Sequence, residues 1–363
     1  MSQSNLLISS SPHIHSGESV SHVMRSVIWA LMPATALSVM IFGWPALLVI
    51  LITTASCLAT EVIVNRLRHR SSTLGDNSAV LTGILLALTL PPHSPWWICV
   101  IGGAFAIALG KQLYGGLGYN MFNPALIARV FLLISFPVEL TTWPVPNPLL
   151  GDHAFTLSQG LAIIFGGPDM AKQMADVVTA ATPLGQYRTE VGMGHLIKEA
   201  LFGSYGFSYG NAAAGMINGS LGETSAILLA LGGLYLLRKK VITWHIPAAM
   251  FAGCLGPAAL FWVMNPGLYP DPLFHLLTGG LIIGAFFMAT DMVTSPITPL
   301  GQIVFGLGCG LLTYIIRTWG GYPEGVSFAI LIMNSAVPLI DQYTRPAIYG
   351  QTRKVKAGGA ANA

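Results

Sequence analysis

The chain has 363 residues, of which 53% are hydrophobic and only 9% are charged, and its mean hydropathy is +0.66. Soluble domains carry about 25% charged residues, so the composition excludes a soluble enzyme. It also excludes a disordered chain, because disorder requires high charge and few apolar residues. The formal net charge is only +3 and no basic stripe is present, so no nucleic-acid partner is expected. These observations leave an all-α polytopic membrane protein whose immediate surroundings are the lipid bilayer.

Ten apolar segments follow one another along the chain, and each is expected to be a transmembrane helix. They cover residues 24–43, 45–65, 79–90, 96–114, 124–140, 222–237, 242–264, 273–289, 301–317 and 325–341. The third is short and ends in Leu90-Pro91-Pro92. Because irregular backbone cannot face lipid, we expect this segment to be a broken helix inside the bundle. The four cysteines lie singly in apolar runs, which predicts neither a metal site nor an iron–sulfur cluster.

The two halves of the chain share short strings at matching places. Leu81-Thr82-Gly83 recurs as Leu277-Thr278-Gly279, and Gly115-Gly116 recurs as Gly320-Gly321. Five helices per half is an odd number, so two copies would cross the membrane in opposite directions. The sequence therefore predicts two inverted repeats of five helices with broken helices at corresponding positions, although coincidence in an apolar sequence is the alternative.

The distribution of lysine and arginine orients the chain. With both termini in the cytoplasm, the short basic loops also fall inside, as the positive-inside rule requires. We therefore divide the chain into five parts: a cytoplasmic N-terminal segment (1–22), a first five-helix repeat (23–140), a folded periplasmic loop (141–221), a second five-helix repeat (222–344) and a cytoplasmic tail (345–363).

The periplasmic loop contains the string Asp176-Val-Val-Thr179-Ala-Ala181-Thr182. It resembles the flavinylation motif D-x-x-[ST]-[GA]-A-T, in which FMN is joined through its phosphate to the hydroxyl of the last threonine. The small side chain of Ala181 would leave room for a flavin transferase to reach Thr182. Threonine, aspartate and small residues are equally typical of a helix start, so a local structural role is the alternative.

Ionisable residues at membrane depth are candidates for function. Asp291 follows the glycine-rich eighth segment and precedes a stretch interrupted by two prolines. Broken backbone of this kind can contact a cation or a second flavin, whereas a helix-end carboxylate in a cytoplasmic loop is the alternative. Asn123, just before the fifth segment, belongs to the same set of candidates.

Three further charged residues are interpreted from their places in the segments. Asp76 precedes Asn77-Ser78 and is typical of a cap for the third helix, with cation or cofactor contact as the alternative. Arg129 lies about one turn into the fifth segment, where it either snorkels to the interface or holds a carboxylate or phosphate inside the bundle. Glu61, near the end of the second segment, is expected to pair with a neighbouring arginine.

Several strings together closely resemble one protein family. They are Asn120-Met-Phe-Asn123-Pro124, Phe131 to Pro137, Phe287 to Pro296, Arg317 to Pro323, Asn334 to Asp341 and Thr344-Arg345-Pro346. With the Thr182 motif, they resemble the D subunits (RnfD) of bacterial Rnf electron-transport complexes and their relatives, the B subunits of the sodium-pumping NADH:quinone reductases. The resemblance runs from about residue 20 to residue 350.

This resemblance implies a function that composition cannot show. The complex moves electrons between ferredoxin and NAD and couples this to Na⁺ or H⁺ translocation across the bacterial inner membrane. An RnfD-like chain would carry covalent FMN on Thr182 and relay electrons as one component of the complex, with no complete activity alone. Its implied partners are the flavinylated RnfG, the membrane proteins RnfA and RnfE, the iron–sulfur proteins RnfB and RnfC, and a flavin transferase. Related membrane proteins also hold non-covalent riboflavin, which we expect as a second cofactor without a motif to locate it.

Two other functions fit the same architecture. Inverted repeats with broken helices also describe a small-solute channel or secondary transporter, and a scaffold with a vestigial flavin site would keep the motif without using it. The string from Asp176 to Thr182 discriminates against the transporter, because a simple permease has no reason to carry it.

Overall fold

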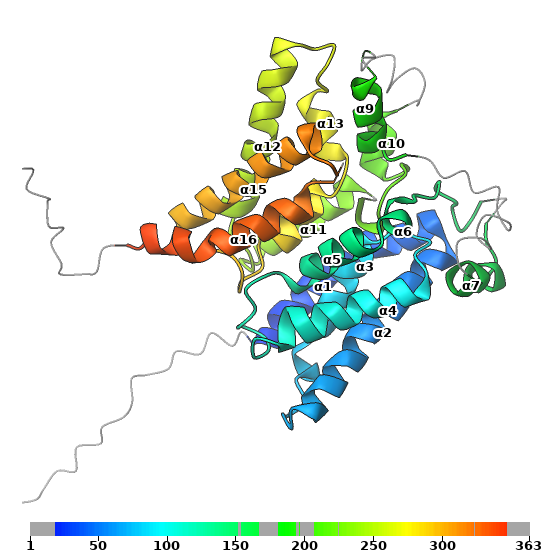
Figure 1. Ribbon diagram of the computed structural model, residues 1–363, viewed down its shortest axis with the longest axis vertical. Coiled ribbons are helices and arrows are strands. Elements are labelled where there is room, and N and C mark those ends of the chain that lie inside the picture. The colour runs from blue at the N-terminus through cyan, green and yellow to red at the C-terminus, as the bar shows by residue number, and fades with distance from the viewer. Residues whose placement is uncertain are drawn as a thin grey trace, which may run out of the picture.

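The computed structural model describes residues 19–151, 154–166, 181–193, 196, 207–223, 225–322 and 324–346. Within these ranges the regular elements are helices (Figure 1). The first half contains α1 (Val20–Phe42), α2 (Trp44–Leu67), the 3₁₀ turn η1 (Leu74–Asp76), α3 (Ser78–Thr89), α4 (Trp96–Phe105) with its π-helical continuation η2 (Ala106–Gln112), α5 (Pro124–Ser135) and α6 (Pro137–Thr141). The second half contains α11 (Ala226–Arg238), α12 (His245–Met264), α13 (Pro272–Leu277), α14 (Leu281–Ile283), the π-helix η5 (Gly284–Met288), α15 (Pro299–Trp319) and α16 (Val326–Tyr343).

Five of these helices are long and apolar enough to cross a membrane, namely α1, α2, α12, α15 and α16. Their outward-facing side chains are also apolar, as Trp29, Leu51 and Val263 illustrate. Exposed apolar surface of this extent is characteristic of contact with a membrane or a protein partner. The helix lengths and the apolar exterior together describe a multi-pass membrane protein.

The chain reverses direction where its residues interrupt a helix. Gly43 separates α1 from α2 with a φ of 73°, a conformation that glycine adopts without strain. Pro45 then occupies the first turn of α2, where no main-chain N–H donor is required. The fifth apolar segment is divided in the same way, because Pro137 begins the short helix α6 directly after α5.

The third and eighth segments differ in how they are interrupted. Helix α3 is a single 12-residue helix, almost wholly buried, that ends just before Pro91-Pro92. At 1.5 Å per residue it is about 18 Å long, too short to cross the roughly 30 Å hydrocarbon core. In the eighth segment, Thr278 to Gly280 separates α13 from α14, and Gly279 has a φ of 68°. Both segments are therefore partial helices inside the bundle, as the sequence indicates.

The two halves contact each other through two pairs of helices. Helix α1 packs against α11, and α5 packs against α16. Within the halves, α2 packs against α3 and α4, while α12 packs against α13 and α15. Figure 1 shows the first half in blue to teal beside the second half in yellow-green to red.

The described part of the segment between the halves folds against them. It contains α7 (Leu157–Gly166), α9 (Pro183–Gly192), α10 (Tyr209–Ala214) and the 3₁₀ turn η4 (Leu221–Glu223). Helix α7 lies against α2, where Gly160 leaves space for Trp44. An apolar cluster joins α9 and α10 to α13; its members are Leu184, Tyr187, Phe207, Ala212, Ile217 and Phe274. This cluster fixes the start of α9, where Thr182 lies.

Candidate functional site

Thr182 lies immediately before helix α9. Its Oγ1 accepts a hydrogen bond from the Gly185 N–H at 3.1 Å, and its carbonyl accepts one from the Gln186 N–H at 2.8 Å. These are the bonds of a helix N-cap, and Pro183 at the first helical position suits that role. The local structural interpretation of the motif is therefore correct for Thr182. It does not compete with the functional interpretation, because the Thr182 O–H bond takes no part in either contact.

Thr182 forms part of the wall of a cavity of about 200 Å³ and is itself only 3% exposed. The other lining residues are Arg129, Leu133, Leu140, Thr141, Trp143, Ala181, Gly185, Tyr322 and Glu324. Apolar and aromatic side chains with a few polar groups are typical of a cofactor site. Because Thr182 is buried, a group joined to its hydroxyl would lie in this cavity.

A buried ion pair lies at the same cavity. Arg129 Nη2 on α5 donates to Glu324 Oε2, just before α16, and both side chains are largely buried. The second terminal nitrogen, Nη1, finds no hydrogen-bond partner among the described residues. Arg129 therefore holds a carboxylate inside the bundle, one of the two alternatives for this position, and keeps a donor available beside Thr182.

Two tyrosines secure the helices next to Thr182. Tyr187 on α9 packs edge-on against Phe274 with ring centroids 6.0 Å apart, and burial raises its pKa. Tyr209 on α10 donates its hydroxyl to Asp271 Oδ1 at 2.6 Å. Burial and this carboxylate raise the pKa of Tyr209, so both hydroxyls stay protonated at neutral pH and preserve these contacts.

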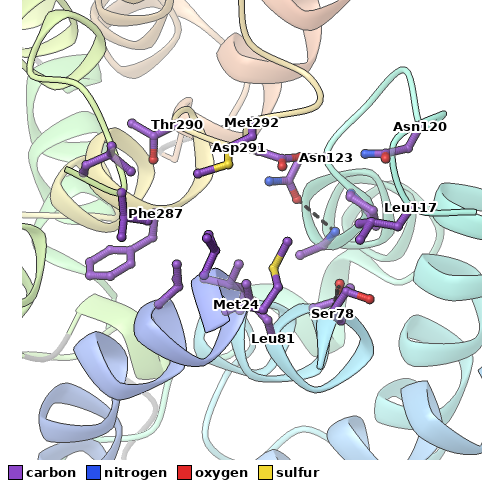
Figure 2. Close-up of a pocket in the computed structure, with 18 of the residues that line it drawn as sticks. Met24, Ser78, Leu81, Leu117, Asn120, Asn123, Phe287, Thr290, Asp291 and Met292 are labelled. Carbon is purple, nitrogen blue, oxygen red and sulfur yellow. Dashed lines mark hydrogen bonds between the residues drawn. The ribbon is translucent and has the colours of Figure 1, made fainter. Parts of the chain in front are cut away.

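A second cavity lies between the two halves (Figure 2). Asn123 and Asp291 both line it, together with Met24, Asn120 and Met292. Its volume is about 80 Å³. The π-helices η2 and η5 also contribute to its wall, through Lys111, Phe286 and Phe287. Single π-helical turns often occur at functional sites.

Asn123 joins the halves at this cavity. Its Oδ1 accepts hydrogen bonds from the N–H groups of Ala125 and Leu126, which caps α5, and its Nδ2 donates to the Met288 carbonyl at 3.2 Å. Asp291 accepts from the Thr294 hydroxyl at 3.2 Å and from the Val293 N–H at 3.5 Å. Its carboxylate thus caps the broken backbone after η5 and also lines the cavity.

Asp76 lies one residue before Asn77, the N-cap of α3, whose own side chain makes no capping bond, and Asp76 instead satisfies the first N–H of the helix. Its Oδ1 accepts from both the N–H and the hydroxyl of Ser78, at 2.8 and 2.5 Å. The expected partner of Glu61 is wrong, because Glu61 Oε1 contacts Lys111 Nζ at 2.5 Å. The packing of α2 against α4 and η2 brings these distant residues together. The neighbouring arginines, Arg66, Arg68 and Arg70, are exposed.

The sequence-predicted site residues thus fall into two places. Thr182, Ala181 and Arg129 share one cavity, while Asn123 and Asp291 share the other and Asp76 lies near it through Ser78. Asp176 and Thr179 lie outside the described residues. Sequence reasoning missed Glu324, Tyr322 and Lys111. Only the pairing of helices far apart in the chain reveals their positions.

One known protein family matches nearly the whole chain. The sequence profile of the NQR2, RnfD, RnfE family matches residues 7–350. The chain belongs to this family. The match covers both cavities and both halves, including the segment that carries Thr182.

Individual relatives in the NQR2, RnfD, RnfE family are similar over nearly their whole length. The D subunit of an ion-translocating oxidoreductase complex from Stutzerimonas stutzeri is 48% identical over 93% of this chain and 94% of its own. The D subunit of a proton-translocating ferredoxin:NAD⁺ oxidoreductase complex from Clostridium ljungdahlii is 45% identical over 95% and 96%. The D subunit of the Escherichia coli ion-translocating complex is 41% identical over 95% and 99%.

Proposed function

We propose that this chain is a membrane subunit of an ion-translocating ferredoxin:NAD oxidoreductase complex and carries FMN in phosphoester linkage on Thr182. The observation that carries the proposal is the cavity of about 200 Å³, in which Thr182 lies beside Arg129 and the aromatic side chains of Trp143 and Tyr322. The names of the relatives support the complex. The partners proposed are RnfA, RnfB, RnfC, RnfE and RnfG, which would complete the complex, and the flavin transferase.

The residues of the cavity suit FMN in three ways. The Thr182 hydroxyl can form the ester bond, and the N-terminus of α9 stabilises negative charge at the phosphate. Trp143 and Tyr322 offer aromatic surface to a planar ring. When bound, FMN supplies the transfer of one or two electrons, while the protein supplies position and electrostatics.

The test is the attachment itself. We expect the full chain, purified from a host with an active flavin transferase and denatured, to give a flavin-fluorescent band with a mass excess of FMN minus water. Thr182→Val should lose both. Thr189→Val is the matched control, because it removes an exposed hydroxyl from the same helix. Fluorescence that survives Thr182→Val would assign the flavin to another residue, and a dark wild-type band would favour a transporter or scaffold.

We also propose a second, non-covalent flavin, riboflavin, in the cavity between the halves. The specific observation is Asn120 Oδ1, which is buried at this cavity and has no hydrogen-bond partner among the described residues. The present volume is small, so the flexible side chains of Met24 and Met292 (Figure 2) would have to move aside for the ring. Asn123 and Asp291 would contact the same ligand.

Acid extraction tests this second site separately from the first. We expect riboflavin in the acid-soluble fraction of the wild-type chain and its loss in Asn120→Leu, which leaves the α5 cap at Asn123 intact. The fluorescent band on Thr182 should persist in the same variant. Riboflavin retained by Asn120→Leu at the wild-type ratio would contradict the assignment.

The arrangement of the halves supports an ion-translocating body. We infer that they are inverted repeats, because α1 faces α11 and α5 faces α16, as a two-fold relation between first and last helices requires. In the bacterial inner membrane, both termini would lie in the cytoplasm and Thr182 on the periplasmic side. Electron transfer through the complex would then be coupled to Na⁺ or H⁺ translocation.

A further inference from the structure

Arg129 and Glu324 form a charge pair at the cavity of Thr182, although 195 positions separate them in the sequence. We propose that Arg129 is the cationic group that contacts a flavin on Thr182, and that Arg129 and Glu324 together set the midpoint potential of that flavin. This inference rests on the proposed function, and it concerns the electrostatics of the site.

Arg129 is one of the residues that line the cavity. Glu324 Oε2 accepts from Nη2, while Nη1 is buried without a hydrogen-bond partner among the described residues. A guanidinium is planar and has donors on more than one edge, so one edge can be held while another binds a ligand. Helix α5, capped by Asn123, fixes the backbone from which Arg129 extends. The donor is therefore positioned before any ligand is present.

The charged groups around this point also include Arg317, which lies within electrostatic reach of Glu223 and Glu324. Glu223, in the turn η4, lies within electrostatic reach of both Glu324 and Arg129. Buried charges interact strongly because little water screens them. Arg129 and Glu324 are the charged residues that line the cavity, while Glu223 and Arg317 interact with them from outside its lining.

The sign of the effect follows from the charge of the flavin. A reduced flavin carries more negative charge than an oxidised one, and charge near its ring tunes its electronics. Arg129 therefore stabilises the reduced form and raises the potential, while Glu324 opposes it. A pair that only tied α5 to the segment before α16 would shift the potential in neither direction.

The experiment measures the midpoint potential of the covalent flavin by spectroelectrochemical titration of the purified full chain. Arg129→Met should lower the potential and Glu324→Gln should raise it. We expect each to change the redox equilibrium constant about tenfold, or about 30 mV for a two-electron couple. Arg129→Lys keeps the charge and should stay closer to the wild type than Arg129→Met.

Glu139→Gln is the matched control, because it removes one carboxylate from the neighbouring helix α6 outside the cavity lining. It should leave the potential near the wild-type value. If Arg129→Met does not fold, the test uses Glu324→Gln and Arg129→Lys instead. Glu324→Gln must then raise the midpoint potential.

The outcomes separate this inference from the proposed function. Attached flavin with no shift, or with shifts of the same sign in Arg129→Met and Glu324→Gln, overturns the electrostatic role and leaves the function standing. A wild-type chain without flavin overturns both. Shifts of the midpoint potential in opposite directions in Arg129→Met and Glu324→Gln, with no shift in Glu139→Gln, support the inference.

Discussion

Each half has one buried cation shortly before a pair of glycines, and the two cations have different kinds of hydrogen-bond partner. Lys111 lies in η2, four residues before Gly115, and Arg317 lies in α15, three residues before Gly320. Their side chains are 2% and 1% exposed. Lys111 Nζ contacts Glu61 Oε1 at 2.5 Å and Ser78 Oγ at 2.6 Å. Arg317 instead donates to two main-chain carbonyls, those of His275 at 2.7 Å and Thr278 at 3.1 Å.

The difference shows what each residue type does inside the bundle. The compact lysine charge is neutralised by a carboxylate, and Asp76 Oδ2 lies 3.9 Å away as a second one. The forked arginine satisfies two carbonyls where α13 ends, those of the buried residues His275 and Thr278. In the described part of the chain, no carboxylate lies within ion-pair distance of Arg317. The first half therefore contains an ion pair, and the second contains a helix cap.

The largest effect is expected from breaking the ion pair. Lys111→Met leaves the carboxylate of Glu61 buried without its cation, so we expect a loss of about 3–5 kcal/mol in the free energy of unfolding. Thermal unfolding of the purified chain in mild detergent, followed by the loss of monodisperse elution, measures this.

The double variant Lys111→Met with Glu61→Leu provides the control. It removes both charges, so most of the lost stability should return, because apolar residues often replace a buried ion pair without net cost. A double variant no more stable than Lys111→Met would mean that Lys111 acts through Ser78 and not through Glu61.

The contrast between these two sites also shows which features of the structure can be predicted from the sequence. Apolar length and proline positions are local signals, so the segments around α1, α2, α3, α12, α15 and α16 could be predicted. The preference of Asp76 and of Thr182 for the start of a helix is local as well. Glu61 pairs with Lys111, 50 positions away, and only helix packing decides such a partner.

The same limit applies to the cavity beside Thr182. The motif identifies Thr182 from the sequence, but Glu324 comes from the opposite half and Arg129 from α5. The position of Arg129 about one turn into a helix left two alternatives open, and the choice between them depended on the contact of α5 with α16. Residues that carry a motif can be found from sequence, whereas residues that complete a site across a helix interface cannot.

A smaller effect is expected at Arg317. Arg317→Met removes a cation that forms no direct ion pair in the described chain, and the carboxylates of Glu223 and Glu324 interact with it only at longer range. The cost comes from the carbonyls of His275 and Thr278 and should be about 2 kcal/mol in the free energy of unfolding. Arg317→Lys should lie between Arg317→Met and the wild type. A loss equal to that of Lys111→Met in the same thermal assay would erase the distinction between cap and ion pair.

The smallest effects, about 1 kcal/mol each, are expected at the paired glycines of the repeated Leu-Thr-Gly string, and they arise from different causes. In Gly83→Ala the new Cβ would lie 2.7 Å from the Thr54 Cα, so α2 and α3 must separate, and the gain in helix propensity offsets part of the cost. In Gly279→Ala the residue has a left-handed φ, and its Cβ would lie 2.7 Å from Arg317 Nη2.

A double-mutant cycle with Arg317→Met separates these causes. Gly279→Ala should couple to it by more than about 0.5 kcal/mol, because the two side chains would collide, whereas Gly83→Ala should be additive within about that amount. The additive pair is thus the internal control for the coupled one. If Gly83→Ala and Gly279→Ala show the same coupling energy with Arg317→Met, the two glycines contribute to stability in the same way. The cap at Arg317 then does not depend on the break at Gly279.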